Sequence, residues 1–184
     1  SYATAKIAGI KMCESYNKQY NTDYICLMPS NTYGPNDNYD SLNSHFFPAL
    51  IKKAHNCKVK KKKILEVWGS GKPLRELIFV DDIADACIFF MKKKTKHHLI
   101  NIGTGKGTSV LELVEIFQEV NKCKIPYRIC DRRIGDVSTL VADNSRAVNL
   151  LNWKPTRTLK DMCLDGWNWI IRNPDGYKDK CKKL

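Results

Sequence analysis

The fold is decided first by residues 1–29, which read SYATAKIAGIKMCESYNKQYNTDYICLMP. Apolar residues recur at helical spacing from Tyr2 to Tyr20, with polar residues opposite, and this period predicts an amphipathic helix. Residues 23–28 follow as a short apolar run rich in strand-forming residues, which Pro29 ends. The stretch therefore predicts a helix followed directly by a strand.

After residue 29, sequence patterns typical of helices and of strands alternate along the rest of the chain. We predict helices at residues 45–54, 81–91, 109–122, 145–151 and 159–172, and strands at residues 64–68, 74–80, 98–102 and 126–130. Asp81 is expected to cap the helix that it begins, and Ser109 with Glu112 forms a capping box. Strands that alternate with helices predict an α/β fold.

The composition excludes several classes of protein. Of the 184 residues 43% are hydrophobic, and no apolar run approaches the roughly 20 residues that span a bilayer, so we expect no membrane partner. The eight cysteines are scattered without a C-x-x-C pair, which argues against a metal site and against a disulfide framework. Cysteines in apolar stretches suit a reducing, cytoplasmic location.

The net charge of +12 is concentrated in lysine clusters near residues 58–63, 92–96 and 178–183. Neither interleaved aromatic residues nor a nucleic-acid motif accompanies them, so we interpret them as solvated loops and expect no nucleic-acid partner. A basic surface still raises the local concentration of an anionic nucleotide-sugar diphosphate.

Tyr2 and Lys6 are the first candidates for catalysis. Four residues apart on a helix, their side chains lie on one face, one turn apart. A Lys ammonium beside a phenol stabilises the phenolate and lowers the pKa of the Tyr. The Tyr can then exchange a proton with a carbinol oxygen while hydride moves at the same carbon. The Y-x-x-x-K spacing alone is a weak signal.

The residues around this pair resemble those of GDP-L-fucose synthases, which are nucleotide-sugar enzymes of the extended short-chain dehydrogenase family. The resemblance covers about residues 1–120 and rests on residues 1–9, 13–16, 28–38, 43–45, 48–50, 67–71 and 75–82. Its most specific parts are the Y-G-P-x-D-N motif from Tyr33 and the N-S-H motif that ends at His45.

The resemblance implies a role for each matching position. Tyr2 would be the proton donor for 4-keto reduction, and Lys6 its partner and a cofactor ligand. His45 would be the acid in the 3,5-epimerisation and would also lie near the cofactor. The loop against the nicotinamide half of NADPH would consist of Pro29, Ser30, Asn31 and Thr32.

The substrate positions come from two resemblances. Lys53, Trp68 and Arg75 match substrate-binding positions of the fucose synthases, as two cations for a diphosphate and an apolar wall. The carboxy-terminal third instead resembles UDP-glucose 4-epimerases, which makes Arg133 and Asp136 candidates for binding phosphate and ribose. This mixture leaves two nucleotides open, GDP and UDP.

The implied function is NADPH-dependent epimerisation at C3 and C5 and reduction at C4 of GDP-4-keto-6-deoxy-D-mannose, which yields GDP-L-fucose. Two alternatives remain: an NAD-dependent epimerase like UDP-glucose 4-epimerase, and a non-catalytic module that retained the sugar-nucleotide pocket. The implied cofactor is NADP, or NAD for the epimerase. The relatives imply a homodimer of the full-length protein.

The resemblance also predicts the domain organisation. Residues 1–33 would end a Rossmann domain, residues 34–184 would mainly form a small α/β substrate domain, and residues 98–105 would return to the Rossmann sheet. We interpret Gly103-Thr104-Gly105 as a structural turn, because it lacks P-loop spacing. The glycine-rich pyrophosphate motif is missing and the sequence does not begin with Met. We therefore expect the carboxy-terminal part of an extended short-chain dehydrogenase, without its amino-terminal βαβ units and inactive alone.

Overall fold

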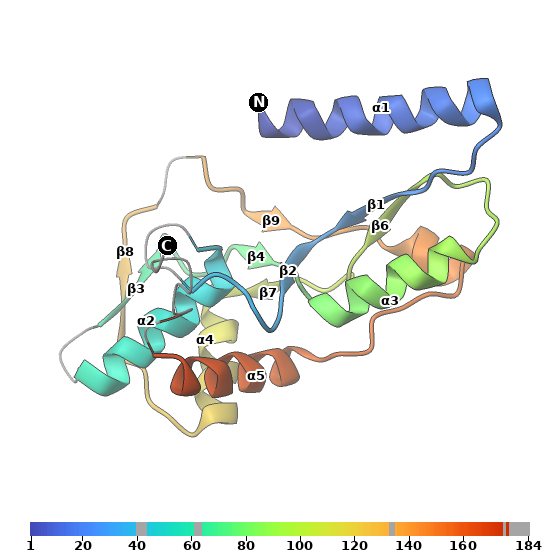
Figure 1. Cartoon of the computed structure of the whole chain (residues 1–184). Helices are drawn as coiled ribbons and strands as arrows, with labels where there is room; N and C mark the ends of the chain where they lie inside the picture. The colour runs from blue at the N-terminus through green and yellow to red at the C-terminus, as the bar shows by residue number, and fades with distance from the viewer. Residues whose placement is uncertain (40–43, 61–63, 133–134, 175, 177–184) are drawn as a thin grey trace, which may run out of the picture. The chain divides into compact units, whose positions relative to one another are not determined.

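A computed structural model describes residues 1–39, 44–60, 64–132, 135–174 and 176 (Figure 1). Its elements are α1 (Tyr2–Tyr20), β1 (Cys26–Pro29), β2 (Asn31–Tyr33), α2 (Phe46–Lys60), β3 (Leu65–Trp68), β4 (Leu74–Arg75), β5 (Leu77–Phe79), α3 (Val80–Met91), β6 (Leu99–Ile102), β7 (Thr108–Ser109), α4 (Val110–Asn121), β8 (Tyr127–Cys130), β9 (Thr139–Leu140), the π-helical turn η1 (Arg146–Leu150) and α5 (Leu159–Arg172). The predicted α/β class is confirmed. None of the described helices is long and apolar enough to cross a membrane.

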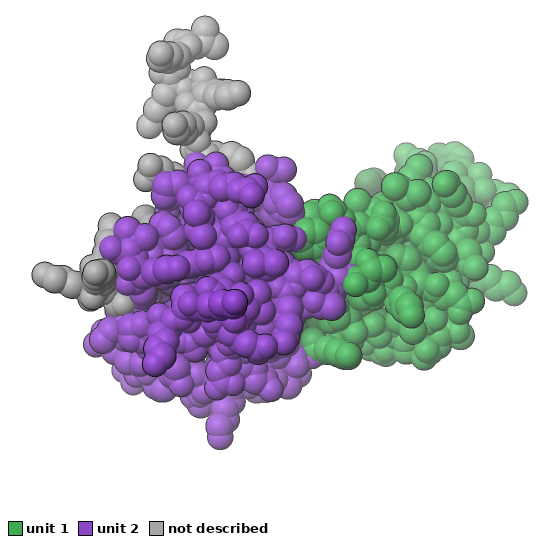
Figure 2. All heavy atoms as spheres, turned by 90° about the horizontal axis from the view of Figure 1, so that it is seen from below, with its two compact units in different colours: residues 1–32, 76–106, 141–156 green, residues 33–75, 107–140, 157–184 purple. Residues whose placement is uncertain are grey.

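The chain divides into two compact units, which Figure 2 distinguishes by colour. Unit 1 consists of residues 1–32, 76–106 and 141–156, and unit 2 of residues 33–75, 107–140 and 157–184. Unit 1 thus includes residues 76–97 and 141–156, which the sequence assigns to the substrate domain. That one unit serves the cofactor and the other the substrate stays a prediction.

Unit 1 is built on the parallel pair β1–β6, in which Cys26 lies opposite Leu99 and Pro29 opposite Ile102. Its hydrophobic core explains why residues 76–97 and 141–156 belong to it, since α3 and the segment around η1 contribute most of the buried side chains. The cluster consists of Ile78, Ala86, Phe90, Ile100, Ile102, Ala147, Leu151 and Trp153.

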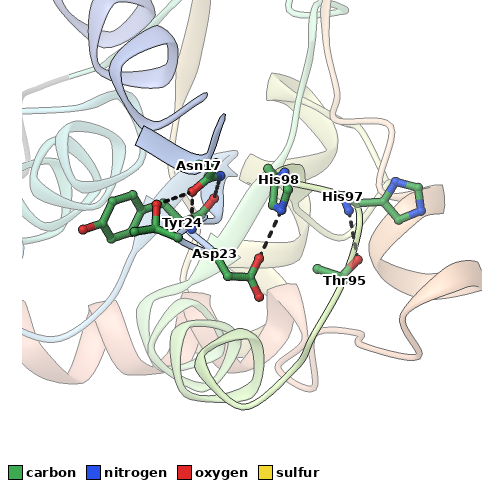
Figure 3. Close-up of polar contacts among 7 residues, drawn as sticks. Asn17, Asp23, Tyr24, Thr95, His97 and His98 are labelled. Atoms are coloured by element: carbon green, nitrogen blue, oxygen red, sulfur yellow. Dashed lines mark hydrogen bonds and ion pairs between the residues drawn. The ribbon is translucent and has the colours of Figure 1, made fainter. Parts of the chain in front are cut away.

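The helix α1 forms as predicted, but it has no buried residue. Ile7, which the sequence places on its apolar face, is 58% exposed, and Met12 is 61% exposed. Asn17 fastens the end of the helix to the segment before β1 (Figure 3): its Nδ2 donates to Tyr24 O at 2.9 Å, and its Oδ1 accepts from Tyr24 N at 2.8 Å. These contacts tie the helix that carries Tyr2 to the entry of β1.

The described residues of unit 2 form two small sheets, the parallel pair β3–β8 and the order β7-β4-β9, with α5 packed against α2 and α4. Gly166 of α5 permits close packing, because a Cβ there would lie 2.3 Å from Tyr33 Oη and 2.4 Å from Ile51 Cδ1. The predicted capping box of Ser109 and Glu112 is confirmed, and Thr158 with Asp161 forms a second one at α5.

Three element predictions need correction. Asp81 does not cap α3, because the helix begins one residue earlier at Val80 and Phe79 is its N-cap residue. The expected strand 74–80 is two strands, β4 and β5, separated by the buried Glu76. The helix α2 begins at Phe46 and continues beyond the expected residue 54 to Lys60.

Candidate functional site

Tyr2 and Lys6 lie one turn apart in the first part of α1. Lys6 Nζ is 5.4 Å from the centroid of the Tyr2 ring, and Tyr2 is 77% exposed. An ammonium group therefore accompanies a phenol that a ligand can reach. This is an arrangement that can give a proton to a carbonyl oxygen.

The Pro29–Thr32 segment lies where the carboxyl ends of the parallel strands β1 and β6 meet. Ser30 N donates to Ile102 O at 2.9 Å, and Asn31 Nδ2 donates to Glu76 O at 2.9 Å. Ser30 Oγ is buried and has no hydrogen-bond partner among the described residues. Because ligands of open α/β sheets bind beyond the carboxyl ends of strands, the position of this segment, and not the buried hydroxyl itself, fits contact with a ligand such as a nicotinamide.

Glu76, which the sequence did not single out for any role, is completely buried next to Arg75. Its Oε1 accepts from Thr104 N and, at 3.1 Å, from Gly105 N, and its Oε2 accepts from Ala142 N at 2.5 Å. A Cβ at Gly103 would lie 2.2 Å from Oε1. The amide groups of Thr104 and Gly105 are therefore occupied by a carboxylate, which agrees with a structural role for the 103–105 turn.

Unit 2 contains a cavity of about 510 Å³, a size usual for small-molecule sites. Four of the five side chains predicted to bind substrate line it: Lys53, Trp68, Arg75 and Asp136. The fifth, Arg133, lies outside the described residues. Lys53 is on α2, Trp68 ends β3 and Arg75 ends β4. Side chains from distant parts of the sequence thus share one cavity wall.

Arg75 and Asp136 lie against each other in this cavity. Arg75 Nη2 donates to Asp136 Oδ1 at 2.5 Å and to Val137 O at 2.7 Å, and only 13% of the Arg75 side chain is exposed. The pairing of β4 with β9 brings them together, since Leu74 N donates to Ser138 O at 2.8 Å. Arg75 Nη1 also donates to Leu74 O at 2.7 Å, so the guanidinium is held in a fixed orientation, and Nε and one N–H of Nη1 remain for a ligand.

Trp68 is 51% exposed, so it is a wall of the cavity and not a core residue. The alternation along β3 explains this, because Leu65 and Val67 point into the core while Glu66 and Trp68 point outward.

His45 lies in unit 2 directly before α2 and is exposed. Ser44 and Phe46 line the cavity, whereas His45 is not among its lining residues. Asp37 was interpreted from the sequence as a turn residue. Its Oδ2 is buried without a hydrogen-bond partner among the described residues, and burial raises the pKa of this carboxyl group. Asp37 also lies close enough to His45 for a positive charge on the imidazole to lower the pKa of the Asp37 carboxyl group. Asp37 is therefore a candidate functional residue beside His45, which the composition of the turn alone did not reveal.

Comparison with known proteins extends these observations. Residues 1–103 match the model of the NAD dependent epimerase/dehydratase family. The chain is 40% identical over 174 residues to GDP-L-fucose synthase 1 of Arabidopsis thaliana, covering 94% of this chain and 53% of the relative. It is 36% identical over 186 residues to GDP-L-fucose synthase of Escherichia coli K12, covering 96% of this chain and 58% of the relative. The chain thus spans about half the length of the curated relatives it matches.

Solved structures show the same fold. A UDP-N-acetylglucosamine 4-epimerase from Methanobrevibacter ruminantium M1 superimposes with a TM-score of 0.82 at 25% identity, covering 94% of this chain and 54% of the other. A GDP-6-OMe-4-keto-L-xylo-heptose reductase from C. jejuni superimposes with a TM-score of 0.79 at 31% identity, covering 92% and 60%. From the family match and the relatives together, the chain belongs to the NAD dependent epimerase/dehydratase family.

Proposed function

We propose that a protein of the relatives' full length containing this chain converts GDP-4-keto-6-deoxy-D-mannose to GDP-L-fucose by 3,5-epimerisation and NADPH-dependent 4-reduction. The observation that carries the proposal is the cavity of unit 2, where Lys53, Trp68, Arg75 and Asp136 meet. Relatives named GDP-L-fucose synthase, at 36–40% identity over most of the chain, support the choice of a GDP-sugar. A homodimer and a cytoplasmic location belong to the same proposal.

In this mechanism Arg75 and Lys53 neutralise the diphosphate, and Asp136 accepts hydrogen bonds from ribose hydroxyls. During epimerisation a base, which the resemblance places in the amino-terminal half of the full-length protein, removes the proton from a ring carbon, and His45 supplies a proton to the opposite face of that carbon. Tyr2 then donates its phenolic proton to the oxygen at C4, and Lys6 supports the phenolate that results. NADPH would supply the hydride when bound, and the residues that would hold its nicotinamide half are Lys6 and residues 29–32, which lie at the carboxyl ends of β1 and β6.

A deuterium exchange experiment tests the roles of His45 and Tyr2. In D₂O we expect the full-length wild-type protein to incorporate deuterium at C3 and C5 of the sugar and then to reduce C4. We expect Tyr2→Phe to keep the exchange while losing reduction by about a hundredfold or more, and His45→Gln to lose the exchange itself. Equal losses of both steps in both variants would contradict the assignment.

The alternative is an NAD-dependent 4-epimerase of UDP-sugars. The fold of the UDP-N-acetylglucosamine 4-epimerase and the R-x-G-D motif that ends at Asp136 favour it. Such an enzyme interconverts C4 epimers without net oxidation of its cofactor and without the acid of a 3,5-epimerisation. Full epimerase activity of His45→Gln on a UDP-sugar would therefore support the alternative.

A further inference from the structure

Glu66 is an acidic side chain in a cavity that otherwise suits an anion. It lines the cavity of unit 2 together with Lys53, Trp68 and Arg75. Along β3, Glu66 and Trp68 are two residues apart and both point outward, so a carboxylate and an exposed indole lie side by side on one face. A diphosphate would be repelled by this carboxylate. The part of the ligand that reaches Glu66 must therefore offer hydrogen-bond donors, either N–H or O–H groups.

The groups that face Glu66 keep it ionised and in place. Arg128 lies opposite Glu66 in the parallel β3–β8 pair, and its Nη2 donates to Glu66 Oε1 at 2.5 Å. This hydrogen bond lowers the pKa of Glu66, and the charges of Arg128 and Lys53 lower it further. No donor from the described residues bonds to Glu66 Oε2. The carboxylate thus retains acceptor capacity for a ligand.

Guanine matches this acceptor better than uracil does. The Watson–Crick edge of guanine carries two adjacent donors, N1–H and the 2-amino group, which pair with the two oxygens of a carboxylate. Uracil presents one N–H between two carbonyl oxygens, so a second carboxylate oxygen would face a carbonyl. We propose that Glu66 reads the guanine base of the nucleotide, with the Trp68 indole as the surface on which the base stacks. This inference rests on the proposed GDP-sugar function and names the residue that sets its base specificity.

The test measures the binding of GDP, IDP and UDP by calorimetry to a full-length protein that contains this chain, called wild type below. IDP differs from GDP only in lacking the 2-amino group, so it probes one hydrogen bond. We expect wild-type protein to bind GDP roughly tenfold more tightly than IDP, since a bidentate base contact gives about five- to a hundredfold discrimination. Glu66→Gln keeps one acceptor oxygen but places an amide N–H₂ group opposite the 2-amino group of guanine. This variant should lower the affinity for GDP to that for IDP and leave the affinity for UDP unchanged.

Glu119→Gln is the matched control, because Glu119 is another exposed glutamate of unit 2 in an ion pair, at 2.8 Å from Lys160, and does not line the cavity. It should bind all three nucleotides as wild type does, and thermal unfolding checks that both variants fold. Equal affinity of wild-type protein for GDP and IDP, or a Glu66→Gln variant that loses all three nucleotides equally, would overturn the role of Glu66 while GDP binding stands. Failure of GDP to bind wild-type protein would instead contradict the proposed function.

Discussion

Replacing Glu76 by Gln should destabilise the chain strongly, although it exchanges only one oxygen for an amide nitrogen. The buried carboxylate of Glu76 accepts from the backbone amides of Thr104, Gly105 and Ala142. An amide has only one oxygen, so its N–H₂ group must face either Ala142 N or the Thr104–Gly105 pair. At least one partly buried backbone donor and the new N–H₂ group then lack acceptors.

The magnitude follows from counting these groups. Each buried unsatisfied donor costs about 1–3 kcal/mol, so we expect a loss of roughly 2–5 kcal/mol in the free energy of unfolding. With an m-value of about 2 kcal/mol/M, the urea midpoint followed by circular dichroism should fall by about 1–2.5 M. Asp85→Asn, which changes an exposed carboxylate of α3 in the same unit, should stay within about 0.5 kcal/mol of wild type. A midpoint for Glu76→Gln equal to that of Asp85→Asn would refute the reasoning.

Three further predictions follow from the surroundings of Arg75, Asp37 and Gly166. Arg75→Lys should weaken GDP binding roughly ten- to a hundredfold in calorimetry, because lysine cannot reproduce the fork that Asp136 and Val137 O hold in place; unchanged affinity would place the diphosphate elsewhere. Burial raises the pKa of Asp37, so this carboxyl group favours folding when protonated, and its contribution is lost as pH rises through the raised folded-state pKa. At pH 7 the urea midpoint of Asp37→Asn should therefore be higher than that of wild type, and the difference between the two midpoints should vanish near pH 4. A difference between the midpoints that does not change with pH would contradict this. Gly166→Ala should lower the thermal midpoint by several degrees, since a methyl group would overlap Tyr33 Oη, and a wild-type midpoint would show that α5 shifts freely.

The α/β class was predictable because periodicity is a local property of the sequence. The helix from Tyr2 to Tyr20 and the capping box of Ser109 were visible within a few residues, and the structure confirms both. The exposure of Ile7 was not predictable, because amphipathicity shows that a helix has an apolar face but not what covers it.

The contacts of the candidate site depend on residues far apart in the sequence. Arg75 and Asp136, 61 residues apart, were each proposed by resemblance, but their mutual hydrogen bond is a product of the β4–β9 pairing. Glu76 was missed because its partners lie 28 residues or more away, and a glutamate between two short strands gives no local signal of burial. Asp37 resembled an ordinary turn residue, because the composition of a turn does not show that one of its carboxylate oxygens is buried.

The central claim is tested most directly by incubating GDP-4-keto-6-deoxy-D-mannose and NADPH with a full-length protein that contains this chain, and identifying the product by chromatography. The account predicts GDP-L-fucose with one NADPH oxidised per product, and loss of this product in Arg75→Lys at limiting substrate. Absence of NADPH oxidation, together with interconversion of UDP-sugar C4 epimers by the same preparation, would contradict it.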